Sequence, residues 1–110
     1  MNFLVIPPKE NNDYDKLLDY LDGCHHTYTS SSTYDDKIFK LLSNCDKLIV
    51  YTKDTDPLMT SVLIGAALCL NIHVYIIGTL KFQAPEAWLK VTGISFYTDT
   101  RNFLHEYFFN

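Results

Sequence analysis

The sequence predicts a single α/β domain, residues 1–110, of the flavodoxin-like or Rossmann-like class: a five-stranded parallel sheet with helices on both faces. Short runs that are apolar almost throughout, such as Phe3–Ile6, Lys47–Tyr51 and His73–Ile77, are typical of strands buried on both sides. They alternate with segments whose apolar residues recur at helical spacing. A length of 110 residues suits one domain with its own core.

In the first half of the chain, the strand Phe3–Ile6 ends at two prolines, which cannot continue a sheet ladder. The helix that follows is expected to end with Gly23 as its C-terminal cap. A short second strand is expected over 25–29, and a loop of serines leads from it to a second helix. The apolar positions of these two helices are Tyr14, Leu17, Leu18 and Leu21, then Tyr34, Ile38, Leu41 and Leu42.

The second half begins with the strand Lys47–Tyr51. Asp56 then predicts a helix N-cap, since its carboxylate can accept from free amides and Pro57 suits the first helical position. This helix, 57–70, is apolar on nearly every side, so we expect it to pack against both the sheet and a neighbouring element. The last strands are expected over 73–77 and 94–97, and Thr98 or Asp99 is expected to cap a final helix.

Strands that alternate with helices connect by right-handed crossovers, which favours the strand order 2-1-3-4-5. Ligands of such sheets bind at the carboxyl ends of the strands, where the strand order reverses. Here this switch point lies between the first and third strands. It brings together the loop that begins at Pro7 and the loop from Thr52 to Asp56, which leads into a helix N-terminus that favours anionic or polar groups.

Composition argues against several classes of partner. The net charge is −4 and Arg101 is the sole arginine, which disfavours a nucleic-acid polymer as partner. The apolar run Val62–Leu70 is about half the length of a membrane helix, so no membrane partner is expected. Three cysteines at irregular spacing do not indicate a disulfide framework, and the chain opens without a basic leader. We therefore expect a cytoplasmic protein.

No cofactor or metal is expected from the motifs. The sequence contains neither G-x-G-x-x-G nor a P-loop. Cys24, His25 and His26 are adjacent in sequence, so on a strand they would point to opposite faces and would not share an ion. His73 opens a strand and is expected to be structural, and His105 is expected to face solvent.

The stretch from Cys45 to Val74 resembles the nucleoside 2-deoxyribosyltransferase-like family. The start and end of the chain are similar to that family too, through the proline-containing loop after the first strand and the segment Gly93–Asp99 before the last helix. The family implies a Rossmann-like domain that handles nucleosides or nucleotides. The matching residues are Cys45-Asp46, Leu48–Tyr51, Asp54, Asp56, Thr60, Gly65, Ala67, Leu70 and Val74.

The chain departs from this family at two positions. The family's nucleophilic glutamate, two residues before the helix glycine, is replaced by Leu63, and a glycine at the helix start is replaced by Met59. Leucine cannot form a glycosyl intermediate, so the resemblance implies a binding pocket without the family's covalent chemistry.

The residues expected to contact a ligand lie at or beside the predicted switch point: Ile6, Pro7, Lys9, Thr52, Asp54, Asp56, Met59, Thr60 and Leu63. Several have a purely structural alternative. Asp56 is most simply an N-cap, Thr60 can bond back to its own helix, and Met59 and Leu63 can be core or the floor of an apolar pocket. Gly65, in mid-helix, suggests close packing on the sheet.

Aromatic side chains gather in the last third of the chain, where Phe82, Trp88, Tyr107 and Phe108 are expected to form an interface between copies of the protein. Packing against the sheet is the alternative for the same residues. We expect a homo-oligomer.

Three hypotheses about function follow from this pattern. The first is non-catalytic binding or sequestration of a nucleoside, nucleotide or ADP-ribose-like ligand, such as a nucleotide messenger of antiviral signalling. The second is a deoxyribosyltransferase or N-glycoside hydrolase that uses Asp54 or Asp56. The third is a protein-interaction module with a vestigial pocket.

Overall fold

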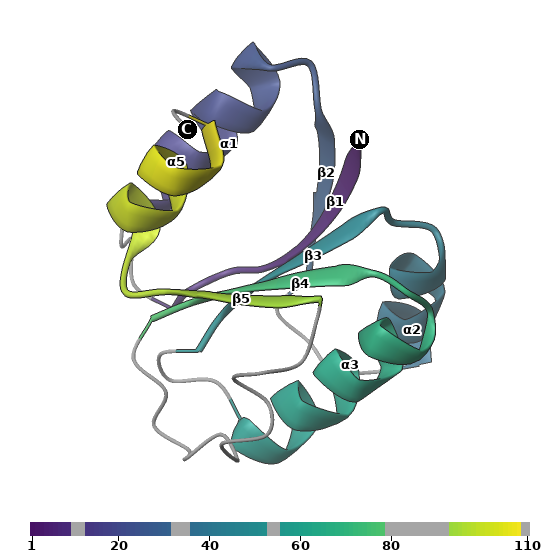
Figure 1. The fold of residues 1–110 in the computed structure, drawn as a ribbon. Helices are drawn as coiled ribbons and strands as arrows, with labels where there is room; N and C mark the ends of the chain where they lie inside the picture. The colour runs from purple at the N-terminus through teal and green to yellow at the C-terminus, as the bar shows by residue number, and fades with distance from the viewer. Residues whose placement is uncertain (10–12, 32–35, 53–55, 79–92, 109–110) are drawn as a thin grey trace.

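Five parallel strands form one sheet in the order β2-β1-β3-β4-β5, as the sequence predicts. The computed structural model describes residues 1–9, 13–31, 36–52, 56–78 and 93–108. The order reverses between β1 and β3, which lie side by side (Figure 1). The strands are β1 Asn2–Ile6, β2 Thr27–Ser30, β3 Lys47–Tyr51, β4 His73–Ile77 and β5 Ile94–Tyr97.

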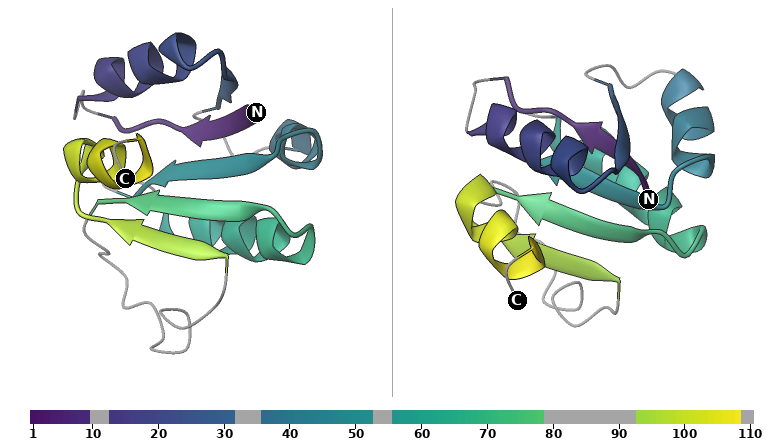
Figure 2. Two further views of the ribbon diagram at one scale, coloured as in Figure 1. Left: turned by 45° about the horizontal axis from the view of Figure 1, so that its top comes forward. Right: turned by 90° about the horizontal axis from the view of Figure 1, so that it is seen from above.

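Helices cover both faces of this sheet, which makes three layers (Figures 1 and 2). On one face, α1 (Tyr14–Gly23) lies beside α5 (Thr100–Phe108). On the other face lie α2 (Asp36–Ser43) and α3 (Pro57–Cys69). The fold class expected from the sequence, a flavodoxin-like or Rossmann-like α/β domain, is confirmed.

After a polar first residue, the three central strands are apolar because their alternate side chains enter two separate cores. In β3, Leu48 and Val50 pack with α2 and α3, whereas Ile49 and Tyr51 pack with α1 and α5. All four side chains are buried. Both cores together hold the sheet between its helix layers.

Two predicted helix caps are confirmed. The Asp56 carboxylate accepts hydrogen bonds from the amides of Leu58 (3.0 Å) and Met59 (3.4 Å), with Pro57 at the first turn. The Asp99 carboxylate accepts one from the amide of Asn102 at 2.7 Å, so Asp99 and not Thr98 caps α5.

The second strand begins later than predicted, at Thr27 and not at His25. His25 has a φ of 60°, and its amide donates to the carbonyl of Asp22, so it belongs to the turn that closes α1. Gly23 is still helical and Cys24 occupies the C-cap. The boundary was missed because β2 is an edge strand of exposed and half-exposed residues, without an apolar run to mark its start.

Within the described residues, one side of α3 is exposed, whereas its composition predicts packing against both the sheet and a neighbouring element. The side chain of Leu58 is 72% exposed and that of Val62 is 47% exposed. Gly65 is also exposed, and no heavy atom of the described residues would lie within 4 Å of a Cβ placed there. The prediction that Gly65 marks close packing on the sheet is therefore wrong.

Candidate functional site

The switch point predicted from the sequence lies at the carboxyl ends of β1 and β3. Ile6, the last residue of β1, pairs with Val50 near the end of β3. Pro7 and Thr52 therefore leave the sheet from neighbouring strands at the same edge. Because the chain proceeds from β1 to α1 on one face and from β3 to α3 on the other, the two connections diverge here, as ligand sites of such folds require.

The N-terminus of α3 forms one side of this edge. The Asp56 carboxylate holds two amides of the first turn, and the Thr60 amide donates to the Asp56 carbonyl at 3.0 Å. Asp56 itself is exposed. It therefore caps the helix and also presents a negative charge to solvent at the edge where we expect a ligand.

The remaining residues predicted to bind a ligand differ in their accessibility. Lys9 is exposed, and Pro7 and Met59 are half-buried. Thr52 is buried, with its hydroxyl 3.5 Å from the carbonyl oxygen of Ile77. Asp54 lies outside the described residues.

Ile6, Thr60 and Leu63 are all buried. Leu63 is 1% exposed and belongs, with Ile6 and Val50, to the core between the sheet and α3. The sequence left two interpretations of Leu63 open, core packing or the floor of an apolar pocket. Its surroundings are those of a core side chain.

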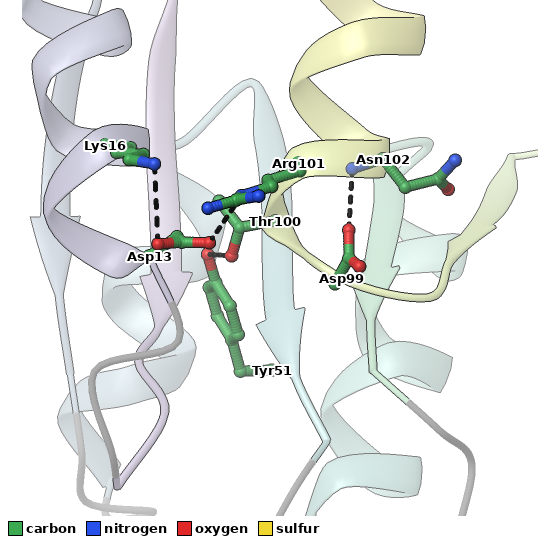
Figure 3. A network of polar contacts seen from close by, with 7 residues as sticks. All are labelled: Asp13, Lys16, Tyr51, Asp99, Thr100, Arg101 and Asn102. Atoms are coloured by element: carbon green, nitrogen blue, oxygen red, sulfur yellow. Dashed lines mark hydrogen bonds and ion pairs between the residues drawn. The ribbon is translucent and has the colours of Figure 1, made fainter.

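A polar network on the α1 and α5 side of the same edge was not foreseen from sequence (Figure 3). The hydroxyls of Tyr51 and Thr100 share a hydrogen bond of 2.9 Å, which joins the end of β3 to the start of α5. The hydroxyls of Tyr14 and Ser30 share one of 2.7 Å, which joins α1 to the end of β2. The two tyrosine rings meet edge to face at 5.8 Å.

An ion pair closes this network at the surface. The Asp13 carboxylate accepts from Nε of Arg101 at 3.2 Å and lies 3.7 Å from Nζ of Lys16 (Figure 3). Asp13 precedes α1 with a φ of 59°, and Arg101 lies in the first turn of α5. The pair, whose two residues are 88 positions apart in sequence, thus ties together the N-termini of α1 and α5. Its one signal in the sequence was that Arg101 is the sole arginine.

Burial raises the pKa of Tyr51 to about 12, and its hydrogen bond to Thr100 opposes this only in part. Burial also raises the pKa of Tyr14. Both phenols are therefore neutral at physiological pH. They can donate and accept hydrogen bonds at the carboxyl edge of the sheet, but they are poor proton acceptors there.

Neither of the two hollows described here contains a predicted ligand residue. One of about 410 Å³ is lined by Asp19, Tyr20, Gly23 and Cys24 at the end of α1. Another of about 370 Å³ lies at the amino ends of β4 and β5. Within the described residues no three His, Cys, Asp or Glu side chains are placed to hold a metal ion. Nor is any described helix long and apolar enough to cross a membrane.

The residues expected to form an interface are described only in part. Tyr107 is half-buried, and its ring stacks on Phe103 at 5.3 Å within the protein's own core. Phe82 and Trp88 lie outside the described residues, as does the side chain of Phe108. The homo-oligomer stays a prediction.

No protein-family model matches the sequence, and no curated protein does so either. Among solved structures, the fold is similar to that of a Clostridium botulinum CMP N-glycosidase, BcmB. The TM-score is 0.66, with 14% sequence identity, over 96% of this chain and 97% of the other. Nearly the whole chain therefore shares its fold with a nucleotide N-glycosidase.

Proposed function

We propose that this protein binds a nucleoside, a nucleotide or an ADP-ribose-like ligand at the carboxyl edge of β1 and β3 without cleaving it. Support comes from the fold, which is similar over nearly its whole length to that of a CMP N-glycosidase. It also comes from the divergence of the two connections at this edge, which is where such folds bind ligands.

The proposal that the protein does not cleave its ligand rests on the chemistry and burial of Leu63. A glycosyl-transferring nucleophile needs a carboxylate that reaches the sugar from the pocket. Leu63 offers no such group, and its side chain is 1% exposed in the core. The nearest acid in sequence among the described residues, Asp56, accepts from two amides of α3 through its Oδ1.

Asp56→Asn tests whether the charge at the start of α3 acts on the ligand. Asparagine caps a helix about as well as aspartate, so the fold is retained while the charge is lost. We expect wild-type protein to bind at least one member of a panel of nucleosides, nucleoside monophosphates, cyclic nucleotides and ADP-ribose. For the ligand that wild type binds, Asp56→Asn is expected to change the Kd about tenfold. Failure of the folded wild-type protein to bind any of them would overturn the proposal.

N-glycoside hydrolysis is the second candidate, and the identity of the structural neighbour favours it. In this version Asp54 or the exposed Asp56 stabilises the positive charge that develops on the sugar as the base leaves. Chromatography of a CMP incubation distinguishes the two functions. Free cytosine that disappears in Asp54→Asn or Asp56→Asn would establish hydrolysis, and intact CMP would support binding alone.

A further inference from the structure

A second polar cluster lies at the opposite edge of the sheet, at the amino ends of the strands on the α5 face. Lys47 of β3 pairs with His73 of β4, and Tyr75 of β4 pairs with Ser95 of β5. Tyr107 of α5 covers them from above, since its ring lies 5.2 Å from that of Tyr75. We refer to these five residues as the amino-edge cluster. None of them was assigned to the candidate ligand site.

Lys47 is held in this cluster without a carboxylate. Its Nζ donates to the Tyr75 hydroxyl at 3.0 Å and lies 5.3 Å and 5.9 Å above the ring centroids of Tyr75 and Tyr107. Within the described residues no Asp or Glu oxygen lies within 4.0 Å of it. An ammonium group carries three N–H donors, and contacts with Tyr75 use one of them.

His73 and Ser95 supply further donors beside this ammonium. Nε2 of His73 and the Ser95 hydroxyl share a hydrogen bond of 2.9 Å, and the His73 ring lies 4.6 Å from that of Tyr75. All the cluster's side chains except that of Tyr75 are half-exposed. His73 also borders the hollow of about 370 Å³ at this edge, whose other lining residues include Leu68 and Ile72 on the α3 face of the sheet.

We propose that the amino-edge cluster binds a small oxyanion of the phosphate class, through Lys47, Ser95 and the ring of His73. Phosphate suits this arrangement because donors arrive from three adjacent strands, and its oxygens accept from several directions at once. The site is independent of the proposed nucleotide site, which lies at the other edge.

Charges around the cluster agree with this assignment. Burial lowers the pKa of His73, and the nearby charge of Lys47 lowers it further. An anion between the two groups would remove that repulsion. Among the described residues, the other titratable groups that act on the cluster are Tyr97 of β5, Glu106 of α5 and Cys24 at the end of α1. Burial raises the pKa of Tyr97, and the nearby charge of the exposed Glu106 raises it further.

The test is a pH titration of the His73 ring by NMR, with inorganic phosphate or with chloride at equal ionic strength. Phosphate is expected to raise the pKa of His73 and to do so saturably. Lys47→Met is expected to weaken the response at least tenfold, whereas Lys47→Arg retains it. Lys40→Met, on the exposed surface of α2, is the matched control and is expected to behave like wild type.

Ribose 5-phosphate in place of inorganic phosphate identifies the source of the anion. A response to both probes assigns a free-phosphate site, and a response to the ester alone assigns a phosphate carried by a larger molecule. Glu106→Gln is expected to tighten binding in either case. No shift of His73 in folded wild-type protein, or an equal loss in Lys47→Met and Lys40→Met, overturns the proposal. Either result would leave the proposed nucleotide site standing, because the panel of nucleosides and nucleotides tests that site separately.

Discussion

At the scale of single residues, Asp56 combines two tasks that one pair of substitutions can separate. Its carboxylate accepts from two amides of α3 and is exposed at the edge where a ligand is expected. Asp56→Ala removes both the cap and the charge, so the free energy of unfolding is expected to fall by about 1 kcal/mol in urea titrations. Asp56→Asn is expected to change it by less than about half of that amount. Equal losses in both variants would mean that the charge, and not the cap, stabilises α3.

Tyr51 makes the stability of the protein sensitive to alkali. Because burial raises its pKa in the folded state to about 12, the folded protein holds the phenolic proton more tightly than the unfolded chain does. The stabilisation is complete below pH ~10 and is lost as pH rises through the folded pKa, by an amount on the order of 2 kcal/mol.

Tyr51→Phe is expected to flatten the fall in unfolding free energy between about pH 10 and 12, as followed by urea titrations at several pH values. At pH 7 the loss of the hydrogen bond to Thr100 is expected to cost about 1 kcal/mol. Tyr28→Phe, on the edge strand β2, is the control. If the free energy of unfolding of Tyr51→Phe falls with pH as steeply as that of wild type, other groups cause the fall.

At the scale of elements, α3 contains a glycine that its packing does not require. Gly65 lies in mid-helix, is exposed and has open space around it within the described residues. Gly65→Ala is expected to raise the free energy of unfolding by about 1 kcal/mol, because alanine loses less backbone entropy in a helix. Gly23→Ala, at the last residue of α1, is expected to raise the free energy of unfolding by less. Destabilisation by Gly65→Ala would indicate a close neighbour of that face.

The buried face of the same helix tests whether Leu63 is core. Leu63→Ala is expected to lower the free energy of unfolding by about 2–5 kcal/mol, since it opens a cavity against the sheet. Leu58→Ala, 72% exposed on the same helix, is expected to change it by less than about 0.5 kcal/mol. Nucleotide affinity measured on folded Leu63→Ala is expected to stay near that of wild type. A large loss of affinity would place Leu63 in the pocket.

The strands and helix caps could be predicted because each depends on local sequence. β3 and β4 have the predicted bounds, since strands buried on both faces must be apolar in sequence, and the half-exposed edge strand β5 has its predicted bounds too. The caps at Asp56 and Asp99 need a side-chain acceptor and amides two or three residues away. The turn at His25 could not be foreseen, because it depends on a left-handed backbone conformation that no glycine marked.

The polar contacts between elements could not be predicted from one sequence. Tyr51 and Thr100 are 49 residues apart, and Asp13 and Arg101 are 88 apart. Their meeting depends on α1 and α5 sharing one face of the sheet. Lys47 and His73 likewise become neighbours through the register of β3 and β4. The edge that holds the candidate site follows from topology, whereas its side-chain partners follow from packing.

At the scale of the whole molecule, two polar sites occupy opposite edges of one sheet. Parallel strands place all their carboxyl ends at one edge, where helix N-termini favour anions and polar groups. None of the helices in the described part of the chain begins at the amino edge, so an anion there depends on side chains such as Lys47 and His73. We therefore expect substitutions at the two edges to act independently on ligand binding and on phosphate binding.

The most direct test of the account is mass spectrometry of wild-type protein incubated with CMP and the wider nucleotide panel. Native spectra detect a bound ligand, and denaturing spectra of the same samples detect free base. If the protein binds its ligand without cleaving it, we expect a complex with an intact nucleotide or nucleoside and no free base over many hours. Accumulation of free base and sugar phosphate, or the lack of any complex with folded protein, would contradict it.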